Sequence, residues 1–162
     1  MKRCLLVIYF VVFCLVINAQ KSNSNFSIDV YCSDRYAGVM PVYLQGNYFF
    51  NTQLSSGFYF GYSEYDNTQY STSNYFVGNV TRYYVADHSS AVSPYVSAKL
   101  GFIINNTKGV EVEPYGLDPQ STVFDYGLYA GVRVKIYRSF SSFVELGYGK
   151  EDIVRGGLSF AL

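Results

Sequence analysis

Residues 122–137 read TVFDYGLYAGVRVKIY, and this stretch decides the fold. Its large apolar residues recur at every second position, as Phe124, Tyr126, Leu128, Val132, Val134 and Ile136. The positions between them hold small, polar or charged residues, namely Asp125, Gly127, Tyr129, Gly131, Arg133 and Lys135. Successive side chains of a β-strand point to opposite faces, so this period of two predicts a long strand with one apolar face.

The same alternation continues on both sides of this stretch. Pro41 suits a strand end, because proline cannot donate a hydrogen bond to a neighbouring strand. The alternation is least regular over residues 73–85, which predicts a β-bulge between Asn79 and Arg82. Most connections are short and turn-like, but residues 66–72, 86–92 and 105–121 are predicted to be longer links. In total we predict eight strands, over residues 26–33, 38–50, 53–65, 73–85, 94–104, 122–137, 141–149 and 154–162.

The composition fits strands that cross a membrane. Aromatic residues make up 19% of the 162-residue chain, tryptophan is absent, and charged residues are 15%, against about 25% in an ordinary globular protein. No apolar run after Gln20 approaches the length of a membrane-spanning helix. Membrane strands have this composition because only alternate residues face lipid.

The polar face separates a membrane barrel from a soluble ligand-binding barrel in the periplasm. A soluble barrel shows its polar face to water and is expected to fill it with charges. Here that face is mainly Gly, Ser and Tyr with isolated charges, which suits the crowded lumen of an eight-stranded barrel. We therefore predict an all-β fold, an eight-stranded antiparallel up-and-down transmembrane β-barrel, and keep the soluble barrel as an alternative.

The N-terminus predicts export. Lys2 and Arg3 precede a wholly apolar stretch over residues 4–17, and Ala19 supplies a small residue for cleavage. Residues 1–19 are predicted to be a cleaved signal peptide and residues 20–162 the barrel domain; the alternative is a helix that stays in the membrane. Losing Lys2 and Arg3 would leave 10 basic and 12 acidic residues, a balance that does not suggest nucleic-acid binding. Cys32 would then be alone, so no internal disulfide is expected.

Five segments resemble the small outer-membrane β-barrel domain family of the porin-like superfamily. They are FNTQLSSGFYFGYSEY (50–65), SPYVSAKLGF (93–102), YGLYAGVRVKI (126–136), FVELGYG (143–149) and RGGLSFAL (155–162). The resemblance covers nearly all of the chain after the signal. It implies an eight-stranded barrel in the cell outer membrane, inserted from the periplasm by the barrel-assembly machinery. Family members often end in an aromatic residue, whereas this chain ends in Leu162 with Phe160 before it.

Six charged residues share the polar parity of their strands and form the candidate site: Lys99, Asp125, Arg133, Lys135, Glu145 and Arg155. A charge inside a narrow barrel has to be paired, because desolvating it alone is costly. We predict a structural network of ion pairs, and the alternative is a gated ion path. Arg82 would join the network if a bulge turned it inward.

Catalysis is not expected. His88 is the only histidine and lies in a polar link, so there is neither a multi-histidine metal site nor a second histidine for acid–base work. No cofactor motif is present. The expected function is a monomeric outer-membrane barrel with a structural or surface-interaction role. Its partners would be membrane lipid and an extracellular molecule meeting residues 66–72 and 105–121. The alternative is a narrow pore or small-molecule conduit.

Overall fold

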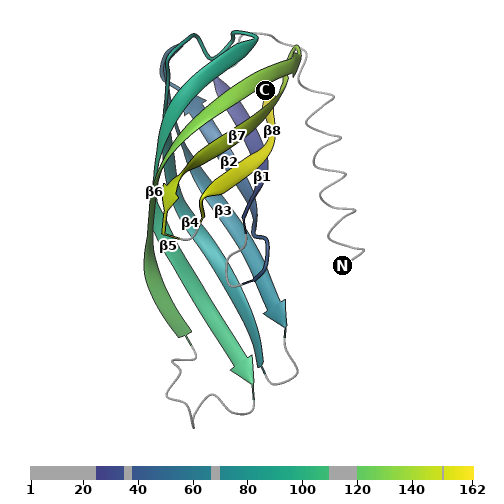
Figure 1. Cartoon of the computed structure of the whole chain (residues 1–162), viewed down its shortest axis with the longest axis vertical. Coiled ribbons are helices and arrows are strands. Elements are labelled where there is room, and N and C mark those ends of the chain that lie inside the picture. Colours follow the sequence, from purple (N-terminus) through teal and green to yellow (C-terminus); the bar gives the residue numbers. More distant parts are fainter. Residues whose placement is uncertain (1–24, 35–37, 67–69, 110–119, 151) are drawn as a thin grey trace.

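The computed structural model describes residues 25–34, 38–66, 70–109, 120–150 and 152–162. The predicted signal peptide lies outside these ranges. Eight strands follow one another along the chain (Figure 1). They are β1 (Phe26–Ser33), β2 (Val42–Phe49), β3 (Leu54–Asp66), β4 (Tyr70–Tyr84), β5 (Val92–Gly109), β6 (Gln120–Tyr137), β7 (Phe140–Gly149) and β8 (Val154–Ala161).

The strands close into an up-and-down barrel. Every strand pairs antiparallel with the next along the chain, and β1 also pairs with β8. Closure leaves no continuous free edge around the wall, which is how a β-structure satisfies its backbone groups without water. The prediction of an eight-stranded antiparallel barrel is confirmed, and Pro41 lies just before β2 as expected. Among the described residues, no helix is long and apolar enough to span a membrane.

The apolar parity of each strand faces outward. On β6, Leu128 is 69% exposed while the adjacent Tyr129 is 3% exposed, and β3 and β7 alternate in the same way. Exposed aromatic and aliphatic side chains therefore cover the outer wall. The inner face carries the charged and small residues, together with a cluster of rings. This is the arrangement that separates a membrane barrel from a soluble one.

The strands differ greatly in length. β5 and β6 have 18 residues each, whereas β1, β2 and β8 have 8. A membrane strand needs roughly 9–11 residues, so β5 and β6 are long enough to extend well beyond a bilayer. In Figure 1 the lower ends of β3, β4, β5 and β6 project past the short strands. We call these four strand ends the projecting sheet: residues 63–66, 70–74, 105–109 and 120–125.

The projecting sheet corrects two predicted links. Most of 66–72 and the outer parts of 105–121 are strand, because β3 reaches Asp66, β4 starts at Tyr70, β5 runs to Gly109 and β6 starts at Gln120. The Ser, Thr and Asn residues in these stretches pair across strands, as in the Thr72–Thr107 hydroxyl contact of 3.2 Å. Residues 67–69 and 110–119, at the tips, lie outside the described ranges.

The predicted bulge between Asn79 and Arg82 is wrong. The register of β4 is continuous against both β3 and β5. Alternation looked irregular because Asn79 and Thr81 are polar residues on the outer face. They are satisfied locally, since the Ser56 hydroxyl donates to Asn79 Oδ1 at 3.1 Å and lies 3.1 Å from the Thr81 hydroxyl. Arg82 points into the barrel without any bulge. The register shift that is present lies between Lys135 and Tyr137.

Aromatic rings fill much of the lumen. Tyr31 and Tyr43 stack with ring centroids 4.8 Å apart, and Tyr43 also contacts Tyr59 and Phe76. Glycine makes room for one of these rings: a Cβ on Gly101 would lie 2.3 Å from the Tyr59 hydroxyl. The ring therefore crosses a gap that only glycine leaves open, and its hydroxyl reaches the charged residues described next.

Candidate functional site in the barrel lumen

Eight charged side chains are buried inside the barrel, each at most 5% exposed. Seven lie on inward positions of six strands and one, Asp152, in the connection between β7 and β8. Four are cations and four are anions, so the lumen is electrically balanced. The eight are Asp29, Arg82, Lys99, Asp125, Arg133, Glu145, Asp152 and Arg155.

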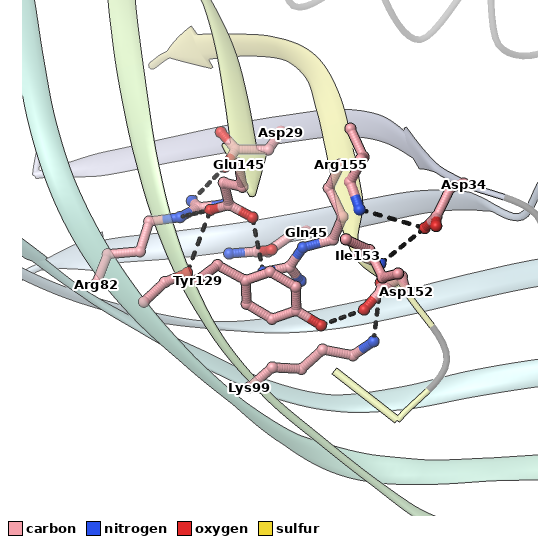
Figure 2. Close-up of polar contacts among 12 residues, drawn as sticks. Asp29, Asp34, Gln45, Arg82, Lys99, Tyr129, Glu145, Asp152, Ile153 and Arg155 are labelled. Atoms are coloured by element: carbon pink, nitrogen blue, oxygen red, sulfur yellow. Dashed lines mark hydrogen bonds and ion pairs between the residues drawn. The ribbon is translucent and has the colours of Figure 1, made fainter. Parts of the chain in front are cut away.

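Five of them form a continuous chain of ion pairs. Its centre is Arg82, whose Nη1 lies 2.5 Å from Asp29 Oδ2 and whose Nε lies 3.1 Å from Glu145 Oε1 (Figure 2). The chain continues from Glu145 Oε2 to Arg155 Nη2 at 2.7 Å. At the other end, Asp29 Oδ1 lies 3.6 Å from Arg133 Nη2. This arginine chain holds three cations and two anions, a net charge of +1.

The other three form a second cluster around Lys99. Its Nζ lies 2.9 Å from Asp125 Oδ2. The same atom lies 3.2 Å from Asp152 Oδ2 (Figure 2). Tyr59 donates its hydroxyl to Asp125 Oδ2 at 2.9 Å, and Tyr129 donates its hydroxyl to Asp152 Oδ1. This lysine cluster carries a net charge of −1, opposite to that of the arginine chain.

The two groups meet at Tyr129. The Arg155 guanidinium carbon lies 3.6 Å from the centre of the Tyr129 ring, a cation–π contact, while the hydroxyl of the same ring binds Asp152. Because both the guanidinium and the carboxylate use one ring, the opposite net charges of the two groups lie near each other. The resulting network links six strands and one connection, and its charged side chains are nearly inaccessible to solvent.

The structure brings together five of the six predicted site residues. Lys99, Asp125, Arg133, Glu145 and Arg155 are all buried in the network. Lys135 has the predicted inward parity on β6, but it is exposed at the end of the barrel and lies in none of the ion pairs among described residues. Lys135 lies two residues before the end of β6, and an inward position so close to a strand end faces solvent.

Sequence reasoning missed two members, Asp29 and Asp152. Asp29 and Tyr31 share the inner face of β1. The same two-residue period that identified the other members could therefore have identified Asp29. Asp152 lies in a connection, where no periodicity predicts which way a side chain points. Its carboxylate nevertheless lies in the lumen, where it contacts Lys99 and Tyr129.

The network offers little chemistry of its own. Within the described ranges, no group of three or more His, Cys, Asp or Glu is placed to hold a metal ion. His88 belongs to the connection between β4 and β5 and not to the ion-pair network. Its backbone N–H donates to Thr52 O at 3.0 Å, and its ring stacks on that of Phe49 with the ring centres 4.1 Å apart. Removing one member of such a buried pair is costly, because it leaves the other charge uncompensated.

Solved structures of small membrane barrels share this fold. The N-terminal β-barrel domain of Pseudomonas aeruginosa OprF superposes with a TM-score of 0.66 at 17% identity, covering 86% of this chain and 98% of that one. Neisserial surface protein A gives 0.59 at 16% identity, with 86% and 98% covered. A de novo designed transmembrane β-barrel gives 0.54 at 19% identity, with 89% and 99% covered. No protein-family model and no curated protein matches the sequence.

These likenesses define the class. The chain has the fold of the small eight-stranded outer-membrane β-barrels, as its sequence segments predicted. At such low identity the shared property is the architecture, so the role of this chain has to be argued from its own residues.

Proposed function

We propose that this protein is an integral barrel of the cell outer membrane with a structural or surface-interaction role and no catalytic activity. The outer wall supports the location. Phe58, Leu128 and Tyr148 are 78%, 69% and 74% exposed, on different strands. Side chains of this size and polarity are compatible with lipid and costly in water. Lipid is therefore the first partner, and insertion would use the barrel-assembly machinery.

The observation that carries the surface role is the projecting sheet. The pairing of β6 with β7 begins at Gly127. The preceding residues 120–125 therefore pair on one side only, with β5, among the described residues. Residues 63–66 of β3 likewise pair with β4 alone. Unpaired strand edges offer backbone N–H and C=O groups, and an extended peptide can bind them as an added strand. We propose that an extracellular partner binds here.

The alternative role as a pore or conduit is not favoured by the lumen. The ion-pair network and the ring cluster occupy the middle of the barrel, and every charged member is nearly inaccessible to solvent. A hydrated ion would have to separate ion pairs that are 2.5–3.2 Å long. In planar bilayers the folded protein is therefore expected to give no channel events. Steady single-channel conductance would contradict the structural reading and support the pore.

Location and orientation can be tested together in intact cells. The native Cys32 is first replaced by Ser, and single cysteines are introduced as Lys108→Cys near the projecting sheet's tip or Arg138→Cys in the β6–β7 hairpin. Both positions are exposed and lie at opposite ends of the barrel. A membrane-impermeant maleimide is expected to label only Lys108→Cys until the outer membrane is permeabilised. Labelling of Arg138→Cys alone in intact cells would show the opposite orientation. Labelling of both variants only after permeabilisation would contradict an outer-membrane location.

A further inference from the structure

A cavity opens at the end of the barrel opposite the projecting sheet, where three hairpins and the last residue of β8 meet. Its volume is about 370 Å³. The lining is basic: Arg133, Lys135 and Arg138 contribute three cations, and Asp87 is the one acidic residue among the lining residues. Hydroxyl groups complete the wall, including those of Ser27 and Ser141.

Arg133 is the key residue because it is buried but poorly compensated. It is 5% exposed, and its Nε and Nη2 have no hydrogen-bond partner among the described residues. Its ion-pair partner, Asp29, lies 3.6 Å away and is held at 2.5 Å by Arg82. Arg133 is thus the terminal cation of a chain with net charge +1. A buried guanidinium is normally paired more closely than this, so Arg133 is the buried cation of the network whose charge is least compensated.

Neighbouring groups hold Arg133 in place at the cavity wall. The Arg133 guanidinium lies over the rings of Phe49 and Tyr84, at 5.8 Å and 5.5 Å from their centres. The His88 ring stacks on Phe49, so the long 85–91 hairpin is fixed against the cavity wall. Asp87 is engaged with its own hairpin, where its Oδ1 accepts the Ser89 backbone N–H at 2.8 Å. That hydrogen bond lowers the pKa of the Asp87 carboxyl, so this group stays ionised and offsets only one of the three cations.

We propose that this cavity binds a phosphate group, with Arg133, Lys135 and Arg138 as the cationic ligands. A guanidinium and phosphate match in geometry, since parallel N–H groups bind two oxygens of one phosphate. Lysine and serine side chains add a point charge and hydroxyl donors. The phosphate can belong to a soluble anion or to a phospholipid headgroup, because Arg138 follows the exposed Ile136 and Tyr137 on the outer wall. This site is independent of the surface role proposed for the other end.

The test uses the folded full-length barrel in maltoside micelles, which contain no phosphate. Inorganic phosphate is titrated in one arm and phosphatidylglycerol in the other, with sodium chloride at matched ionic strength as reference. Backbone amide shifts in nuclear magnetic resonance spectra report binding. Saturable shifts around Arg133 with inorganic phosphate support a soluble anion as the ligand. Saturable shifts with the lipid alone support a headgroup. No saturable shift in either arm, or equal shifts with chloride, would overturn the proposal.

Variants localise the site. Lys135→Gln with Arg138→Gln removes two exposed cations without touching the buried network, and binding is expected to weaken by roughly tenfold or more. Arg138→Gln alone should give an intermediate loss. Lys108→Gln is the matched control, because it removes an exposed cation at the opposite end and is expected to leave binding unchanged. Native affinity in the double variant, or an equal loss in the control, would refute the assignment.

Discussion

Arg82 offers the most direct test of the ion-pair network, and we predict that Arg82→Met strongly destabilises the barrel. The substitution keeps an unbranched, flexible side chain of similar volume but removes the charge. Asp29 then loses its partner at 2.5 Å and retains only Arg133 at 3.6 Å, while Glu145 retains Arg155 at 2.7 Å. One carboxylate is therefore left poorly paired in a site that excludes water.

Breaking a buried ion pair from one side costs about 3–5 kcal/mol. The lower part of this range applies, because Glu145 keeps its second cation and the methionine still fills most of the volume. We expect the free energy of unfolding to fall by about 3 kcal/mol. Urea titration of the barrel in lipid vesicles measures it, provided that unfolding and refolding curves coincide. Lys135→Met is the control: methionine in place of a cation at an exposed position outside the network should change stability by less than about 0.5 kcal/mol.

A double-mutant cycle separates pairing from packing. Glu145→Gln alone removes the negative charge from between two arginines, and in the Arg82→Met background its cost should shrink by about 1 kcal/mol or more, since neighbours in one network are coupled. Additive losses would show that Arg82 acts through its bulk. A loss below about 1 kcal/mol for Arg82→Met itself would refute the reasoning, because it would mean that water reaches these carboxylates.

Three further substitutions probe the wall and the lumen. Phe58→Lys, at a position 78% exposed, should cost about 2–4 kcal/mol in vesicles, because lysine then faces lipid; an unchanged stability would argue for a soluble barrel. Gly101→Ala should cost about 1–3 kcal/mol in the same urea assay, since its Cβ would lie 2.3 Å from the Tyr59 hydroxyl, whereas at Gly156 the nearest atom is 3.6 Å away and alanine should be tolerated. Tyr59→Phe removes a buried hydrogen bond to a carboxylate and should cost about 1–3 kcal/mol, against no measurable change for Tyr148→Phe on the outer wall.

Much of the fold can be predicted from the sequence, because contact with lipid requires apolar side chains at every second residue of a strand. Wherever a strand crosses the apolar layer, alternate residues have to be large and apolar, as on β6, so both its existence and its inward face follow from spacing. That is why Lys99, Asp125 and Glu145 are placed inside without any knowledge of the structure. The requirement ends where the membrane ends. Residues 105–109 and 120–121 are polar on both faces of their strands. The sequence pattern of a strand that extends beyond the membrane therefore resembles that of a loop.

The candidate site was less predictable, for a related reason. Parity tells which side a residue faces but not its height along the barrel, and height decides which charges meet. Arg82 lies across the lumen from Glu145 because of the register and tilt of distant strands. Lys135 has inward parity yet lies too near the strand end to be buried. Asp152 has no parity, since it lies in the connection between β7 and β8 and not in a strand. Pairing in the lumen is thus a tertiary property.

A filled lumen also constrains where function can lie in so small a barrel. The eight buried charges balance and come from six strands and one connection, and buried rings pack beside them, so the lumen leaves little room for a solute. The outer wall is committed to contact with lipid. Only the two ends are left, and they differ in chemistry. One is a sheet with unpaired edges that suits an extended peptide, and the other is a basic cavity that suits a phosphate. The arginine chain ends at Arg133, which lines the cavity, and its ion pair with Asp29 is the longest in the chain. An anion bound in the cavity would therefore pair with the terminal cation of the arginine chain.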